Sequence, residues 1–178
     1  MQAYAIAYYN SLRRSGTLPC MGEEKQFAVI QLPELKWPTS LSLSCSRFRL
    51  FVAADVSNVS VDIISDFVSA ALNRGMVYFC AWGHDCERFH DIVDEVVVED
   101  YLAERRFVEP TTNDTVMTTW HKGETLDTLK EALDFFANWA RPHPGLATDS
   151  SFRLVICVGD PEWAETATRF LQTAEFFI

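Results

Sequence analysis

Four short runs of apolar and β-branched residues recur along this chain, and each is followed by a stretch whose apolar residues are spaced like one face of a helix. The runs lie at residues 48–54, 76–82, 115–120 and 152–158. Continuous apolar runs of this length are typical of strands buried on both faces, which occur mainly in parallel sheets covered by helices. The pattern therefore predicts a three-layer α/β/α fold with a mainly parallel sheet of four or five strands.

The order of these strands stays open at this level, because right-handed crossovers leave two favoured arrangements. With the runs numbered 1 to 4 along the chain, a flavodoxin-like sheet has the order 2-1-3-4 and a Rossmann-like sheet has the order 3-2-1-4. Ligands of open parallel sheets bind beyond the carboxyl ends of the strands, where the order reverses. Asp55 lies at that point in both orders, facing His121 in the first and Asp160 in the second.

The 178 residues are predicted to form a single α/β domain, which is an ordinary size for one hydrophobic core. Residues 47–178 carry the β-α repeats, and residues 1–46 are predicted to be an irregular N-terminal extension that packs on this core. Within the extension, the spacing predicts a helix over residues 2–14. Residues 27–32 are predicted to form an edge strand, since Pro33 ends it.

The charge and the cysteine pattern exclude several classes of partner. The chain has 25 acidic and 15 basic residues and a net charge of −10, which repels phosphate backbones and argues against nucleic acids but suits a basic protein partner. No run approaches the ~20 apolar residues that a membrane span needs. Five cysteines without a CxxC pair, and the lack of a signal-peptide pattern, lead us to expect reduced thiols and a cytoplasmic location.

One row of residues has the composition of an activated nucleophile. Asp85 is expected to cap a helix, which places Cys86 in the first turn, where the helix dipole stabilises a thiolate. His90 and Asp94 follow at successive intervals of four residues, so Asp94 could orient His90 and His90 could act as a base toward Cys86. Cys86, His90 and Asp94 are therefore candidate catalytic residues. The competing interpretation is that such spacing only supports the helix and that the thiol faces the core.

A second group of candidates consists of polar and aromatic residues at the ends of the predicted strands. These candidate ligand-binding residues are Asp55, Trp82, His84, Asp85, Trp120, His121 and Asp160. In one interpretation Trp82 and Trp120 line a flat pocket for a ring. In the other, these are ordinary turn, cap and core residues.

The sequence motifs give little support for a metal site or a cofactor site. His84, Cys86 and His90 lie within seven residues and could hold zinc or iron together with His121, but the usual paired-cysteine and HExxH spacings are missing. No residue is therefore assigned as a metal ligand. The chain also has no GxGxxG, GxxxxGK[ST] or GxSxG motif, so the sequence indicates no particular cofactor and no familiar hydrolase site.

Two functions remain open. The first is a small-ligand site at the carboxyl ends of the strands, with a metal as one version of the ligand. The second is an acidic protein-interaction module without chemistry, of the kind found among immunity and adaptor proteins, with Glu87, Asp91 and Glu95 on a polar helix face. A cleft at the strand ends that contains both His121 and Asp55 would favour the first function, and a flat, aromatic-bearing surface elsewhere with about 1,000 Å² of contact area would favour the second.

Overall fold

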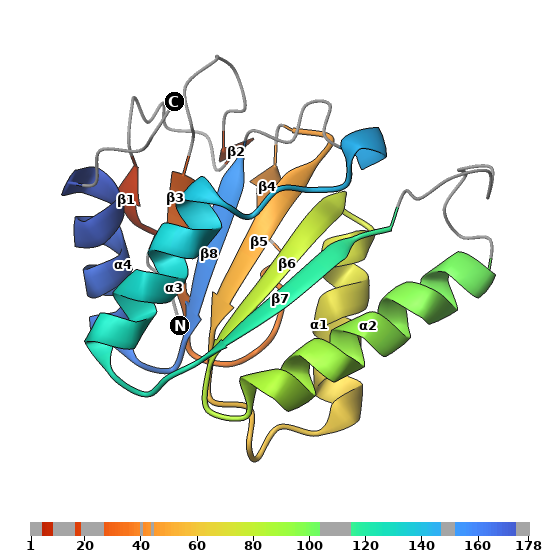
Figure 1. Cartoon of the computed structure of the whole chain (residues 1–178), viewed down its shortest axis with the longest axis horizontal. Coiled ribbons are helices and arrows are strands. Elements are labelled where there is room, and N and C mark those ends of the chain that lie inside the picture. The colour runs from red at the N-terminus through yellow and green to blue at the C-terminus, as the bar shows by residue number, and fades with distance from the viewer. Residues whose placement is uncertain are drawn as a thin grey trace.

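The computed structural model describes residues 5–8, 17–18, 27–39, 41–43, 45–103, 115–146 and 152–173 (Figure 1). In these residues six strands form one sheet with the order β1-β3-β8-β5-β6-β7. The strands of this sheet are, in chain order, β1 (Ala5–Tyr8), β3 (Phe27–Leu32), β5 (Phe48–Ala53), β6 (Met76–Gly83), β7 (Met117–Lys122) and β8 (Arg153–Val158). All neighbouring strands are parallel except β1, which pairs antiparallel with β3. Two further short strands, β2 (Thr17–Leu18) and β4 (Ser42–Leu43), pair with each other.

Helices cover both faces of the sheet and enclose two apolar cores. The helices are α1 (Val61–Leu72), α2 (Cys86–Leu102), α3 (Leu126–Asn138) and α4 (Pro161–Thr173), with a short 3-10 turn η1 (Pro144–Leu146) after α3. Buried residues of α1 and α2 pack against one face, and buried residues of α3 and α4 pack against the other (Figure 1). The predicted three-layer α/β/α fold is therefore confirmed.

The central strands are buried on both faces, as their continuous apolar sequences predict. Leu50 and Val52 of β5 belong to the core under α1 and α2, whereas Phe51 and Ala53 belong to the core under α3 and α4. This alternation follows from the two-residue period of a strand. β7 differs, because it lies at the edge of the sheet and none of its residues is fully buried.

The order of the four predicted strands is the Rossmann-like one. β8, β5, β6 and β7 lie side by side, which is the order 3-2-1-4 when read from β7. From β5 the chain continues to α1 on one face, and from β8 it continues to α4 on the other face. The strand order therefore reverses between β5 and β8, and the flavodoxin-like alternative is wrong.

The N-terminal quarter departs from the prediction in two ways. Residues 5–8 form β1, so the helix predicted over residues 2–14 is wrong there; the rest of that stretch lies outside the described residues. Pairing of Ala5 with Ile30 supplies β3 with a neighbour on its outer side. β3 has the predicted bounds, but it lies between β1 and β8 and is not an edge strand.

The connection from β3 to β5 positions the site described below. Its described part contains no helix, and Leu35 and Trp37 from it pack into the same core as α1. This layer therefore contains an irregular segment beside α1 where a doubly wound fold usually has another helix. None of the helices in the described part of the chain is long and apolar enough to cross a membrane.

Candidate functional site

A crevice of about 820 Å³ opens beyond the ends of β5 and β8, where the strand order reverses. We call it the β5–β8 crevice. Its walls are residues 33–37, one side of α1, and the turns that lead from β5 to α1 and from β8 to α4. Asp55 follows β5 and Asp160 follows β8, and both line the crevice, whereas His121 does not line it. This pair of predicted site residues is the one that the Rossmann-like order brings together.

Most of the crevice wall is apolar and aromatic. Trp37 and Phe67 contribute to it from the buried core, and Trp163 contributes from the first turn of α4. Ile63 of α1 also lines the crevice, and 48% of its surface is exposed. An exposed isoleucine on the crevice side of the helix indicates a surface that can contact an apolar group.

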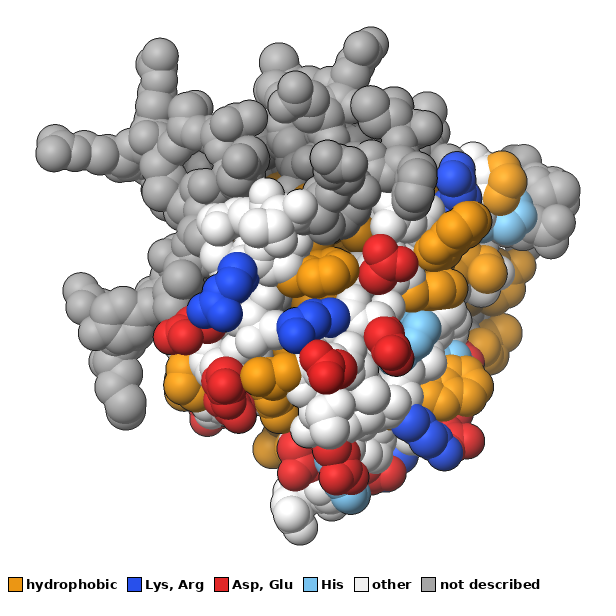
Figure 2. Space-filling model, turned by 60° about the vertical axis from the view of Figure 1, so that its left-hand side comes forward, with side chains coloured by type: hydrophobic (Ala, Val, Ile, Leu, Met, Phe, Trp, Pro, Cys, Tyr) orange, Lys and Arg blue, Asp and Glu red, His pale blue; other side chains and the backbone are white. Residues whose placement is uncertain are grey.

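The charged groups around the crevice are mainly acidic. Glu34, Asp55, Asp66 and Asp160 line it together with one basic residue, Lys36. At the lower edge of the face shown in Figure 2, the edge at which the parallel strands end, acidic side chains gather. The crevice therefore has a negative electrostatic potential at neutral pH.

Local hydrogen bonds hold the carboxylates of Asp55 and Asp160 in place. Asp55 Oδ1 accepts a hydrogen bond from the main-chain N–H of Ser57 at 3.0 Å and another from the Ser57 hydroxyl. The two bonds lower the pKa of Asp55 below its usual value, so this carboxylate is ionised at neutral pH. Asp160 Oδ1 accepts a hydrogen bond from the N–H of Glu162 at 2.8 Å and so caps the start of α4.

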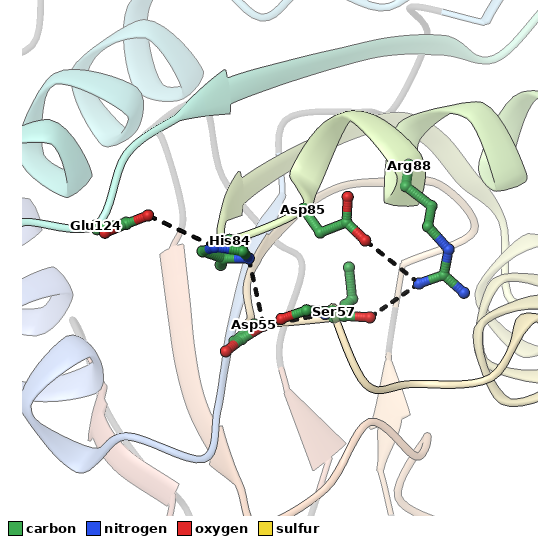
Figure 3. A network of polar contacts seen from close by, with 7 residues as sticks. Asp55, Ser57, His84, Asp85, Arg88 and Glu124 are labelled. Atoms are coloured by element: carbon green, nitrogen blue, oxygen red, sulfur yellow. Dashed lines mark hydrogen bonds and ion pairs between the residues drawn. The ribbon is translucent and has the colours of Figure 1, made fainter.

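His84 connects Asp55 to the turn after β7. Its Nδ1 atom lies 3.9 Å from Asp55 Oδ1, and its Nε2 atom lies 3.7 Å from Glu124 Oε1. Figure 3 shows the imidazole between the two carboxylates. His84 is exposed and lies outside the crevice wall, so it contacts Asp55 from the solvent side without lining the crevice.

Arg88 on α2 fixes the turn that carries Asp55. Its two terminal nitrogens each donate a hydrogen bond of 2.9 Å, one to the carbonyl of Val56 and one to the carbonyl of Val59. Asp85 Oδ2 lies 3.6 Å from the same guanidinium (Figure 3). Asp85 has a positive φ of 59° and makes no side-chain cap bond to α2, so it positions Arg88 and does not line the crevice.

The two tryptophans proposed for one flat pocket lie on opposite faces of the sheet. Trp120 is in register with Ala81, and its neighbour His121 is in register with Trp82. Trp120 is therefore one position away from the residue that pairs with Trp82, and neighbouring positions of a strand face opposite sides of the sheet. The Trp120 side chain lies on the face of α2, where its ring centroid is 4.4 Å from that of His90. Trp82 is fully buried on the other face, 5.3 Å from the Trp163 ring. This geometry argues against the interpretation in which the two tryptophans line one flat pocket.

The candidate catalytic row is present on α2, but its members have other partners. His90 Nε2 lies 3.5 Å from Asp94 Oδ2, as predicted, and 2.9 Å from Thr118 Oγ1. His90 Nδ1 lies 3.2 Å from Asp91 Oδ1. Both ring nitrogens of His90 are thus engaged away from Cys86, which argues against a nucleophile–base pair.

Cys86 faces the core. It is 1% exposed, and its thiol donates a hydrogen bond to the carbonyl of His121 at 3.4 Å. Burial raises the pKa of the Cys86 thiol, which is the opposite of the direction expected from the helix dipole. In the described part of the chain no three His, Cys, Asp or Glu side chains are grouped closely enough to hold a metal ion, so His84, Cys86 and His90 do not converge on one.

We expect Cys86 to react slowly with thiol reagents. Iodoacetamide at pH 7.5 should modify Cys86 at least roughly tenfold more slowly than it modifies free cysteine, because the thiolate is disfavoured and shielded. Peptide mapping over time would measure the rate, and the same protein in urea provides the reactive control. Rapid labelling that His90→Ala slows would contradict this expectation and support the catalytic row.

His121 should make the stability of the fold sensitive to mild acid. Its ring packs against Phe135 at 4.7 Å, and burial lowers the pKa of the imidazole below its ordinary value of 6.5. As the pH falls through this ordinary value, the unfolded chain takes up a proton that the folded chain resists, so the free energy of unfolding falls. Urea unfolding between pH 7.5 and pH 5.5 should show a smaller loss of stability in His121→Leu than in the wild type. An equal loss in both proteins would refute the role of His121.

Sequence reasoning missed several residues of the site because they come from segments with no chemical motif. Trp37 and Glu34 lie in the connection after β3, which resembled an irregular surface extension. A tryptophan between two prolines, Pro33 and Pro38, indicates a loop residue that packs into the core, and this signal could have been recognised. Arg88 had no such signal, because the carbonyls that it binds are visible only in the folded chain.

The comparison with known families gives one match. A family model described as "Domain of unknown function (DUF7684)" matches residues 27–174. The chain belongs to this family. The matched region runs from β3 through α4, so this DUF7684 domain includes the connection after β3 and every wall of the β5–β8 crevice. No curated protein and no solved structure matches the chain.

Proposed function

We propose that this DUF7684 domain binds a small molecule in the β5–β8 crevice. The observation that carries the proposal is the position of the crevice: it lies at the reversal of strand order, with Asp55 and Asp160 in its wall. Open parallel sheets bind their ligands at this point. The crevice volume of about 820 Å³ is also within the range of roughly 300–1,000 Å³ that is usual for small-molecule sites.

The composition of the wall supports binding of an organic molecule. Sites for such molecules combine extensive apolar surface with a few fixed polar groups. In the crevice the apolar surface includes Trp37, Phe67 and Trp163, and the fixed polar groups are the carboxylates of Asp55 and Asp160. The hydrogen bonds at these carboxylates organise them before a ligand arrives, which lowers the entropic cost of binding.

The proposed activity is binding, and no reaction is assigned. Cys86 is buried, and His90 is engaged by Asp91, Asp94 and Thr118. Neither residue lines the crevice. The catalytic role of Cys86, His90 and Asp94 therefore has less support than binding at Asp55 and Asp160.

Filling the crevice would test the proposal. Ala70 lies on α1 in the crevice wall, so Ala70→Phe should occupy space that a ligand needs. Ligand-observed NMR with a fragment mixture should detect fragments that bind the wild type and do not bind Ala70→Phe. Asp62→Phe is the matched control, because Asp62 is exposed on the same helix outside the crevice. Equal binding to Ala70→Phe and the wild type would refute binding in the crevice.

A second candidate function is binding of a basic protein, as an immunity or adaptor protein would do. The observation in its favour is a row of exposed acidic residues along α2, Glu87, Asp91, Glu95 and Glu99. Glu87 already pairs with Lys122 at 2.6 Å, which reduces the charge of the row. Salt-sensitive binding of an oligolysine peptide that Asp91→Asn with Glu95→Gln removes would favour this function, because charge pairs across an interface weaken with salt.

A further inference from the structure

We infer that the ligand of the β5–β8 crevice is a small organic cation, in which an amine, amidine or guanidine group is joined to an apolar or aromatic body. The inference rests on the proposed function, since it requires that the crevice binds a small molecule. It is carried by three features of the wall: the balance of charge, the occupation of a helix start by a carboxylate, and the aromatic rings.

The charge balance favours a cation. Four carboxylates line the crevice, those of Glu34, Asp55, Asp66 and Asp160, against the single ammonium group of Lys36. The carboxylate of Asp55 is also held in its ionised form by the two hydrogen bonds from Ser57. A positive group in the crevice would gain from this potential, and a negative group would be repelled.

The start of α4 supports the same conclusion. The first turn of a helix presents N–H groups that would attract a phosphate or carboxylate of a ligand. Here the carboxylate of Asp160 accepts the N–H of Glu162 and so takes the position that a ligand anion would need. The protein supplies its own anion at this point, which leaves a negative surface facing the crevice.

The aromatic rings favour an organic cation over a metal ion. Trp37, Phe67 and Trp163 line the crevice, and the faces of such rings attract ammonium and guanidinium groups. One face of Trp37 is already covered by the Arg74 guanidinium, whose carbon lies 5.2 Å from the ring centroid, so a ligand cation would contact the other rings of the wall. A metal ion would instead need several converging oxygen ligands, and the described carboxylates form no such group.

Three probes that share one apolar body would test the charge preference. They are 2-phenylethylamine, which is a cation at pH 7.5, 2-phenylethanol, which is neutral, and 3-phenylpropanoate, which is an anion. Titration calorimetry should show that the amine binds at least roughly tenfold more tightly than the alcohol, because its ammonium group forms charge-assisted contacts. The propanoate should bind more weakly than the alcohol. Raising NaCl from about 50 mM to about 500 mM should weaken only the amine.

Variants of the wall would locate the effect. Asp55→Asn and Asp160→Asn remove the charge and keep a side-chain oxygen that accepts the same local hydrogen bond. Each should weaken binding of the amine by about 3- to 10-fold and leave the alcohol unchanged. Asp66→Asn should act in the same direction, whereas Asp62→Asn, one helical turn away and outside the crevice, should have no effect.

The outcomes separate this inference from the proposed function. Fragments that bind in the crevice without any preference for cations, or tighter binding of the alcohol or propanoate than of the amine, would overturn the cation inference and leave small-molecule binding intact. Binding of the amine that none of Asp55→Asn, Asp66→Asn and Asp160→Asn weakens would also overturn it. Binding to neither the probes nor any fragment would refute the proposed function itself.

Discussion

Gly83→Ala is expected to lower the free energy of unfolding by about 3–5 kcal/mol, whereas Gly159→Ala should lower it by only about 1–2 kcal/mol. Both glycines have a positive φ, +124° for Gly83 and +89° for Gly159, so both substitutions carry a conformational cost. A Cβ atom at Gly83 would lie 2.2 Å from the carbonyl oxygen of Ala54, but a Cβ atom at Gly159 would meet nothing within 4 Å.

The clash at Gly83 cannot be relieved by a side-chain movement, because the atom in the way belongs to the backbone. Ala54 is held by a hydrogen bond of 3.0 Å from its N–H to the carbonyl of Trp82. Chemical unfolding of both variants beside the wild type would measure the difference, with Gly159→Ala as the control for the shared conformational cost. Equal losses of stability in the two variants would show that close packing of β6 on the end of β5 is not required.

Trp82→Ala is expected to cost about 3–5 kcal/mol of stability, and Trp120→Ala about 1 kcal/mol or less. Trp82 is fully buried and packs edge-on against Trp163, so truncation leaves a large cavity beneath α3 and α4. Trp120 is 40% exposed at the edge of the sheet and loses mainly its contact with His90.

Thermal or urea unfolding of the two tryptophan variants would distinguish a core residue from a ligand-binding residue. From the sequence alone, both Trp82 and Trp120 were candidates for either role. A ligand-binding Trp82 could be truncated with little loss of stability, and such a result would contradict its assignment to the core. Fluorescence of the remaining tryptophans would report whether the variants retain a folded structure before unfolding begins.

Local patterns predicted the elements of this fold well, because they depend on neighbours in the chain. The apolar runs of β5, β6 and β8 identified buried strands, and the helically spaced apolar residues after each run identified the helices that follow. Thr125 accepts the N–H of Thr128 at the start of α3, and Asp160 does the same for Glu162 at the start of α4. Ser60 caps α1, since its hydroxyl accepts the N–H of Ile63.

Predictions about the direction of side chains were weaker, because they depend on which partner element lies opposite. The row of Cys86, His90 and Asp94 was correctly spaced, but α2 packs on β7 so that the thiol faces the carbonyl of His121. Burial then raises the pKa of Cys86 and outweighs the helix dipole. The faces of Trp82 and Trp120 likewise depend on a register offset of one residue between β6 and β7, which no local pattern specifies.

The sequence by itself determined the fold class and placed Asp55 at the carboxyl end of a buried strand, because apolar periodicity is local and Asp55 directly follows that strand. Only the tertiary structure decided that Asp160 is its counterpart, since this depends on β8 pairing with β5 across about a hundred residues of chain. The tertiary structure also determined which aromatic residues meet in the crevice wall, because Trp37, Phe67 and Trp163 come from three separate segments. Their contacts arise from the order in which the strands pair, and that order is set by the packing of the whole chain.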